Sequence, residues 1–315
     1  MYLEHFGLTQ APFKITPHTE FFFSGANRGA TLDALIYAIR EGDGLVKVTG
    51  EVGAGKTMLC RVLAERLPES VEIIYLAIPS LTRDEILQAI AGDLKLKTKG
   101  LNTAGVLEKL QDHLIKLHEQ GRQVVVLIDE AHAMPLDTLE ELRLLSNLET
   151  NRDKLLQIVL FGQPELDQNL AQPHMRQVKE RITHSFFLRP MPQKDIGEYL
   201  NFRMRAAGYH GPDPFTARCI SMITTVSEGL MRRVNILADK TLLAAYADDT
   251  HTVEPKHVSA AIEDSAFGRK RWFASPLRWV IGGSVAILAL ALIVWTLSPS
   301  SSVVSSTAPS SQATR

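Results

Sequence analysis

The order of hydrophobic and polar residues predicts the main elements of the chain. Three short, mainly apolar runs lie at 45–49, 124–128 and 156–161, and each is typical of a strand buried within a parallel sheet. The segment 81–120, between the first two runs, predicts two helices. Strands that alternate with helices in this way predict an α/β fold around a parallel sheet.

Beyond residue 190 the pattern becomes helical. Pro192, Pro214 and Pro255 lie near three of the expected helix starts, where proline is tolerated. We therefore divide this part of the chain into a first domain at 1–190 and a helical second domain at 191–268. The helices expected in the second domain lie near 193–207, 214–226, 231–247 and 255–266.

The C-terminal region carries a third pattern. Residues 279–297 are nineteen uncharged, mostly apolar residues, which as a helix would span roughly 28 Å, close to the thickness of a bilayer core. Trp279 and Trp295 lie near opposite ends, and the segment 269–278 before the run holds four basic residues. We expect one C-terminal transmembrane helix rather than a buried core helix. The positive-inside rule then places the N-terminal part in the cytoplasm and a short, disordered tail, 298–315, in the periplasm.

Composition adds a few restrictions. The 315 residues carry a net charge of −1, which gives no overall attraction to nucleic acid, so DNA binding would need a local basic patch. The two cysteines have no metal-ligand spacing, which argues against a disulfide framework and fits a reducing compartment. The N-terminus shows no secretory signal peptide.

The segment that follows the first predicted strand carries the clearest chemical signal. It fits the pattern G-x-x-x-x-G-K-[ST] of a phosphate-binding loop, and a helical pattern follows it, which argues against a chance glycine turn. Such a loop turns its backbone N–H groups toward phosphates at a helix N-terminus. We expect Lys56 to reach the β- and γ-phosphates of ATP and the Thr57 hydroxyl to bind Mg²⁺. The residues expected to bind the nucleotide are Gly50, Glu51, Val52, Gly53, Ala54, Gly55, Lys56 and Thr57.

An acidic pair follows the run at 124–128. Asp129, at the end of this strand, is expected to hold Mg²⁺, and Glu130 to polarise the attacking water, because hydrolysis needs both a metal and a group that orients the nucleophile. An ordinary helix start is the alternative, but the phosphate loop earlier in the chain favours an ATPase. His132 completes the string D-E-A-H, and a polar residue at a strand end is its plainest interpretation.

This layout resembles that of an AAA+ ATPase, with a nucleotide-binding core at 1–190 and a helical lid at 191–268. Helicases with a D-E-A-H string need two RecA-like domains, for which this chain has no room. In AAA+ proteins an aromatic N-terminal segment packs against the adenine. For most of the phenylalanines near the N-terminus of this chain, however, a place in the core is the simpler expectation. Those phenylalanines are Phe6, Phe13, Phe21, Phe22 and Phe23.

The same resemblance implies further site residues. Gln163 stands where AAA+ proteins carry a polar sensor, more often Asn, Ser or Thr. Arg181, with Arg176 as second choice, stands where they place an arginine finger that reaches a neighbouring subunit's γ-phosphate, which implies a homo-oligomer. Arg232, with Arg233 as the adjacent alternative, matches the sensor of the lid. For each arginine the alternative is a solvated surface residue.

The strings "FGLTQAPF", "LIDEAHAM", "FGQPEL" and "MRQVKERI" resemble the ExeA family of general secretion pathway ATPases, over roughly residues 1–268. The likeness is strongest to its MshM-type members, which act in biogenesis of the mannose-sensitive haemagglutinin (MSHA) pilus. It implies an ATPase anchored in the inner membrane, with pilus or secretion assembly proteins as partners. Secretion-type relatives carry a periplasmic peptidoglycan-binding domain, whereas only eighteen polar residues follow the predicted span here, which argues against direct peptidoglycan binding.

Two other functions are compatible with parts of this sequence. Related AAA+ proteins with similar N-termini regulate DNA transposition as ATP-dependent filaments on DNA. The near-neutral charge and the predicted membrane span argue against that alternative, and against nucleic acid as a partner. A scaffold without nucleotide chemistry is disfavoured, because Lys56, Thr57, Asp129 and Glu130 are all present.

Overall fold

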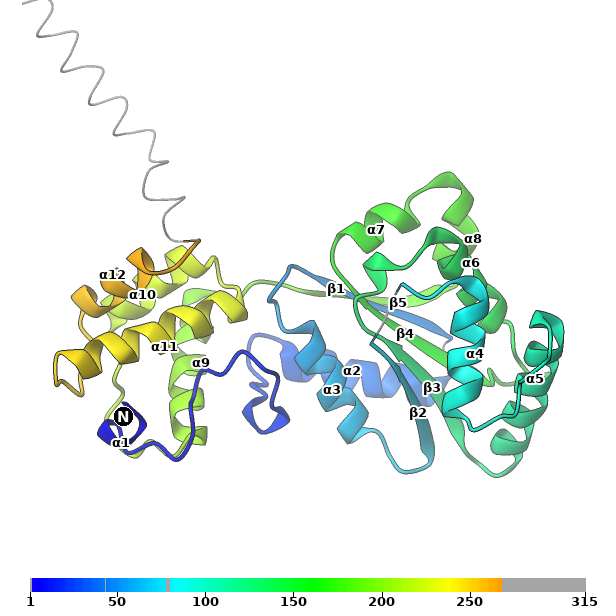
Figure 1. The fold of residues 1–315 in the computed structure, drawn as a ribbon, viewed down its shortest axis with the longest axis horizontal. Coiled ribbons are helices and arrows are strands. Elements are labelled where there is room, and N and C mark those ends of the chain that lie inside the picture. The colour runs from blue at the N-terminus through cyan, green and yellow to red at the C-terminus, as the bar shows by residue number, and fades with distance from the viewer. Residues whose placement is uncertain (1, 43, 78–79, 268–315) are drawn as a thin grey trace, which may run out of the picture. The chain divides into compact units, whose positions relative to one another are not determined.

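Among the described residues, five parallel strands form a single sheet in the order β2-β3-β4-β1-β5 (Figure 1). The computed structural model describes residues 2–42, 44–77 and 80–267. The strands are β1 (Leu45–Gly50), β2 (Val71–Leu76), β3 (Gln123–Ile128), β4 (Leu156–Gly162) and β5 (Ile182–Leu188). The three apolar runs of the sequence are confirmed as β1, β3 and β4, each with an end that shifts by one residue.

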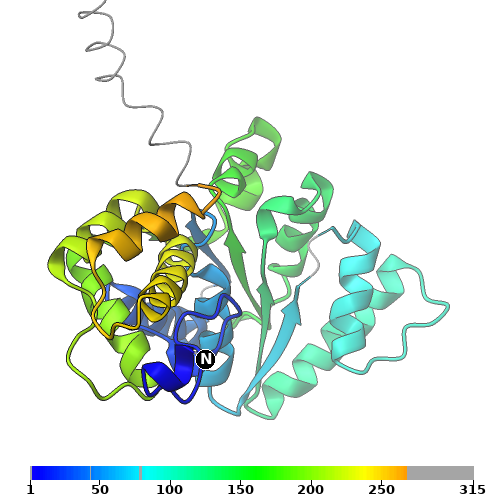
Figure 2. The same ribbon diagram turned by 60° about the vertical axis from the view of Figure 1, so that its left-hand side comes forward.

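Strand side chains alternate between two faces of the sheet, and helices bury both faces (Figure 2). On one face, Val46 and Val48 of β1 pack with helices α2 and α3. On the other face, Val124 and Val126 of β3 pack with α4 to α8. The helices of this layer structure are α2 (Arg28–Glu41), α3 (Lys56–Arg66), α4 (Arg83–Asp93), α5 (Thr103–Glu119), α6 (Leu136–Leu145), α7 (Glu165–Leu170) and α8 (Arg176–Lys179), with short 3₁₀ turns η2 (Ala131–Ala133) and η3 (Pro173–Met175).

The four helices that the sequence predicts beyond residue 190 are present. They are α9 (Gln193–Ala206), α10 (Ala217–Ser227), α11 (Met231–Ala247) and α12 (Pro255–Glu263). Pro192 directly precedes α9 and Pro255 opens α12, as expected. Helix α10 begins three residues after Pro214 instead, because the side chain of Thr216 caps it by accepting from the backbone N–H of Cys219.

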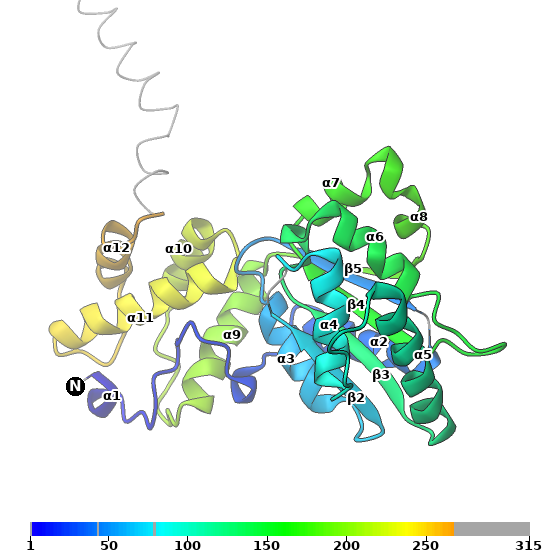
Figure 3. The same ribbon diagram turned by 45° about the vertical axis from the view of Figure 1, so that its right-hand side comes forward.

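The N-terminal segment packs along the second domain (Figure 3). It contains α1 (Tyr2–His5) and the 3₁₀ turn η1 (Thr19–Phe21). The hydroxyl of Tyr2 donates to the Asp239 carboxylate of α11 over 2.7 Å. Four of its phenylalanines are core residues, as expected for most of them, namely Phe6, Phe13, Phe21 and Phe23.

No helix in the described part of the chain is long and apolar enough to cross a membrane. The transmembrane helix expected at 279–297, the basic segment 269–278 and the tail 298–315 lie outside the described residues. Residues Met1–Ser265 form one compact unit, which contains every element named above.

Candidate nucleotide-binding site

The phosphate loop connects β1 to the N-terminus of α3, as its sequence predicts. Gly53 and Gly55 adopt left-handed φ values of +81° and +101°, which favour glycine. At Gly50 a Cβ atom would lie 2.9 Å from the carbonyl oxygen of Leu188, so only glycine fits against β5. Helix α3 starts at Lys56, and its first N–H groups therefore face the loop.

The ammonium group of Lys56 lies inside the loop. Its Nζ donates to the carbonyl oxygens of Gly50 (2.8 Å) and Glu51 (3.1 Å), and the side chain is 5% exposed. Burial lowers the pKa of Lys56, while the carboxylates of Glu130 and Asp129 oppose that shift. The loop therefore presents one buried cation beside two carboxylates, which suits a phosphate chain with a bound metal ion.

The acidic pair follows β3 directly. The Asp129 carboxylate is buried, accepts the backbone N–H of Glu130 over 2.9 Å and receives the Tyr75 hydroxyl over 3.4 Å. Burial and then the charge of Asp129 raise the pKa of Tyr75 to about 12. Glu130 adopts a left-handed φ of 54°. Its Oε2 lies 3.4 Å from both Gln163 Nε2 and His132 Nδ1.

The lid closes on the phosphate loop at the start of α11. The backbone N–H of Arg232 donates to the carbonyl oxygen of Gly53 over 3.2 Å. The contact is tight, because a Cβ at Gly53 would lie 2.8 Å from that of Arg232, and one at Gly55 would lie 2.8 Å from the sulfur of Met231. The sequence left Arg232 and Arg233 as alternatives. Of the two, Arg232 lines the nucleotide cavity, whereas Arg233 forms an ion pair with Glu228.

A cavity of about 400 Å³ lies between the phosphate loop and the lid. It brings together residues from four parts of the chain that the sequence identified separately: the loop, the acidic pair, the end of β4 and α11. The predicted site residues that line it are Val52, Gly53, Gly55, Lys56, Thr57, Glu130, Gln163 and Arg232.

The two arginine-finger candidates lie elsewhere on this chain. Arg176 is 80% exposed and pairs with Glu180 over 2.8 Å. Arg181 is exposed between α8 and β5. Together with the nearer Lys154, its charge lowers the pKa of Glu149. Neither lines the cavity of its own chain.

Several lining residues were missed by the sequence analysis. They are Met58, Tyr199, Arg203, Met231 and Asn235. Residues 14–17 also line the cavity, and they belong to the N-terminal segment whose counterpart in AAA+ proteins packs against the adenine. Arg28 is also buried and links the phosphate loop to the segment after β5. Its guanidinium donates to the carbonyl oxygens of Ala54 in the loop (3.1 Å) and of Arg189 (3.4 Å). Met58 and Met231 are direct neighbours of predicted site residues. No local pattern marks the others, because their place depends on how distant segments pack.

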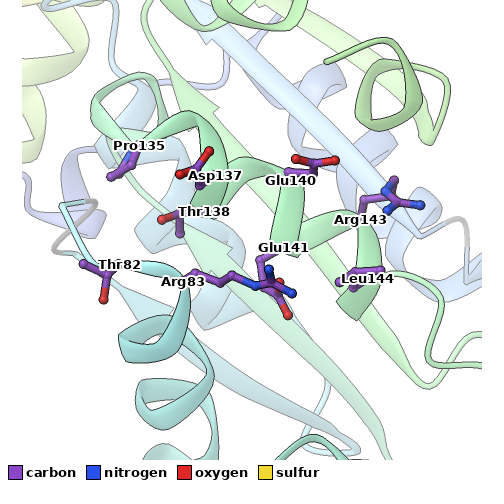
Figure 4. A pocket seen from close by; sticks show the side chains of 9 residues that line it. All are labelled: Thr82, Arg83, Pro135, Asp137, Thr138, Glu140, Glu141, Arg143 and Leu144. Carbon is purple, nitrogen blue, oxygen red and sulfur yellow. The ribbon is translucent and has the colours of Figure 1, made fainter. Parts of the chain in front are cut away.

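A second cavity, of about 480 Å³, lies between the start of α4 and helix α6 (Figure 4). Arg83 and the buried carboxylate of Glu141 form an ion pair in its wall. Asp137 and Glu140 add further negative charge. It contains no residue of the phosphate loop, so the first cavity is the candidate nucleotide site.

The donor set of the first cavity fits a magnesium ion. Mg²⁺ prefers oxygen ligands and in nucleotide sites takes one or two from the protein, with the rest from phosphates and water. Thr57, whose hydroxyl is of this kind, lines the cavity. The Asp129 carboxylate is not among the lining groups, but it is buried directly beside Glu130, which does line the cavity.

The fold and the site define an AAA+ protein of the P-loop class. Residues 39–170 match the family model described as AAA domain. Among solved structures, the chain is similar to Cdc6p from Pyrobaculum aerophilum, with a TM-score of 0.60, 19% identity, and coverage of 78% of this chain and 70% of that one. It is also similar to the ORC2 protein of Aeropyrum pernix, solved as ADPNP-ADP complexes, with a TM-score of 0.58, 16% identity, and coverage of 79% and 72%. These low identities show the fold alone.

A relative with much higher identity specifies the family. General secretion pathway protein A of Aeromonas hydrophila is 38% identical over 291 residues, which cover 91% of this chain and 53% of the relative. The chain belongs to this ExeA family of AAA+ ATPases. It spans about half the length of that relative.

Proposed function

We propose that this protein binds ATP with Mg²⁺ in the cavity between core and lid, hydrolyses it, and uses the turnover to support assembly of a cell-envelope machine. The observation that carries the proposal is the convergence of Lys56, Glu130, Gln163 and Arg232 on one cavity. Together these groups offer a cation for the phosphates, a carboxylate for water and a second cation from the lid.

Each residue has a distinct task in hydrolysis. Lys56 neutralises the β- and γ-phosphates. Thr57 and Asp129 would hold Mg²⁺, which supplies positive charge toward the phosphate oxygens when bound. Glu130 orients the attacking water and accepts its proton, and Gln163, 3.4 Å from the Glu130 carboxylate, helps to position both.

The lid and a neighbouring subunit complete the site in this proposal. Arg232 contacts the γ-phosphate from α11, so the lid position depends on the nucleotide. Arg181 acts as an arginine finger in trans, which its exposure and its absence from the cavity of its own chain support. The protein would therefore work as a homo-oligomer.

The membrane part of the proposal rests on sequence. A single span at 279–297 with basic residues at 269–278 would tether the ATPase to the cytoplasmic face of the inner membrane. Confinement to a surface raises the effective concentration of the ATPase near membrane partners. The relative named for the general secretion pathway supports an envelope role, with type II secretion or MSHA pilus biogenesis as the machine.

The test separates binding from turnover in the full-length protein. Lys56→Ala should weaken ATP binding, whereas Glu130→Gln should bind ATP and hydrolyse it slowly, because an amide is a poor proton acceptor. Glu65→Gln, an exposed change on α3, is the matched control and should keep full turnover. Full turnover in Glu130→Gln would remove Glu130 from the mechanism. ATP-dependent retention of duplex DNA in a filter assay would favour the transposition-type alternative instead.

A further inference from the structure

The N-terminal segment 14–17 lines the nucleotide cavity together with the phosphate loop residues. Within the described chain, neither Ile15 nor Thr16 uses its backbone N–H or its carbonyl oxygen in a hydrogen bond. Ile15 and Val52 are each 53% exposed and line the same cavity. This wall therefore offers apolar surface beside free backbone donors and acceptors, which are the groups that a nucleobase needs.

A buried arginine holds this segment in place. Arg203 of α9 is 3% exposed. Its Nε donates to the carbonyl oxygen of Pro12 over 2.5 Å and its Nη2 to that of Lys14 over 3.3 Å. The guanidinium also lies 4.6 Å from the centre of the Phe21 ring. One side chain thus fixes the backbone immediately before Ile15 to α9, and the ribbon shows the N-terminal segment running beside this helix (Figures 1 and 3).

The same arginine is linked to the helix that carries Arg232. Its Nη1 donates to the Tyr199 hydroxyl over 2.8 Å, and that hydroxyl donates to Asn235 Oδ1 of α11 over 2.7 Å. Among the described residues, no carboxylate forms an ion pair with Arg203. Its N–H groups donate to the carbonyl oxygens of Pro12 and Lys14 and to the Tyr199 hydroxyl. These hydrogen bonds fix the N-terminal segment to α9.

We propose that Arg203 is a positioning residue that sets the base preference of the nucleotide site, by holding the backbone of residues 14–17 at the base. Adenine offers a ring-nitrogen acceptor beside an amino donor, whereas guanine offers an oxygen acceptor in place of that donor. A backbone N–H beside a carbonyl oxygen matches adenine and opposes guanine, but only while the backbone is held still. This inference rests on the proposed nucleotide binding.

The test compares three ligands on the full-length protein: ATP, GTP and inorganic triphosphate. Arg203→Lys keeps the charge but cannot reach both carbonyls, so ATP affinity should fall about tenfold, the worth of one or two hydrogen bonds. GTP affinity should change little, and triphosphate affinity should stay the same. Tyr199→Phe keeps the ring but removes the hydroxyl that accepts from Arg203. It should lower the ratio of ATP affinity to GTP affinity by a smaller factor than Arg203→Lys does. Arg205→Lys, on the same helix but exposed and paired with Asp213, is the control and should leave all three affinities unchanged.

Each outcome decides the matter. An unchanged ATP-to-GTP ratio in folded Arg203→Lys, checked by circular dichroism, would overturn the proposal. An equal loss of triphosphate affinity would overturn it too, because Arg203 would then contact phosphate directly. If Arg203→Lys does not fold, the ratio in Tyr199→Phe decides alone. Failure of the unaltered protein to bind any nucleotide would instead refute the proposed function.

Discussion

Replacing Gly53 with alanine tests whether the lid really closes on the phosphate loop. The new Cβ would lie 2.8 Å from the Cβ of Arg232 and 3.6 Å from its backbone nitrogen. Since the neighbour is near the backbone rather than at the tip of a flexible side chain, helix α11 must move away. That movement would break the 3.2 Å hydrogen bond from Arg232 N–H to the Gly53 carbonyl oxygen.

Two terms set the size of the effect. The left-handed φ of +81° at Gly53 costs alanine about 1–2 kcal/mol. Loss of the hydrogen bond adds about 0.5–1.5 kcal/mol. Gly100 separates these terms, since its φ of +83° is nearly the same and a Cβ added there would meet no atom within 4 Å. Gly100→Ala should therefore carry only the backbone cost.

The assay measures both stability and ligand affinity. In urea unfolding, Gly53→Ala should lose about 2 kcal/mol or more and Gly100→Ala about 1–2 kcal/mol. Only Gly53→Ala should weaken binding of a fluorescent ATP analogue, because only it displaces Arg232. If both variants bind the analogue as tightly as the unaltered protein, the contact between lid and loop has no role in nucleotide binding.

Three further predictions concern the neighbouring subunit, the tail and the cysteines. Mixing Arg181→Ala with Lys56→Ala subunits should restore some ATPase activity, because one supplies the site and the other the finger; a co-assembled but inactive mixture would refute the trans assignment. Deleting residues 279–315 should leave a soluble protein that still binds ATP, since the residues that line the cavity end at Asn235, while envelope assembly fails in cells; loss of ATP binding would contradict this. Both cysteines are buried, and burial raises the pKa of Cys60, so the native protein should react slowly with a thiol reagent at pH 8 and rapidly only after unfolding; fast reaction of the native protein would show that one thiol is accessible.

The sequence determined the elements and the chemistry that depend on neighbours along the chain. Strands β1, β3 and β4 could be predicted because a strand inside a parallel sheet is buried on both faces, and a continuous apolar run of five or six residues satisfies that requirement locally. The phosphate loop was predicted because its glycines, Lys56 and the first turn of α3 act as one local unit. The acidic pair Asp129 and Glu130 follows from its place at the end of β3.

Only the tertiary structure decided which distant residues meet at the nucleotide. Arg232 and Arg233 are adjacent, and the packing of α11 on Gly53 brings the first to the cavity and leaves the second with Glu228. Four of the five N-terminal phenylalanines fill the core, as the sequence led us to expect for most of them, and residues 14–17 of the same segment line the site. Arg203 holds that backbone from nearly two hundred residues away. Local periodicity carries no signal for such contacts, because they arise only when separate helices and segments pack against one another.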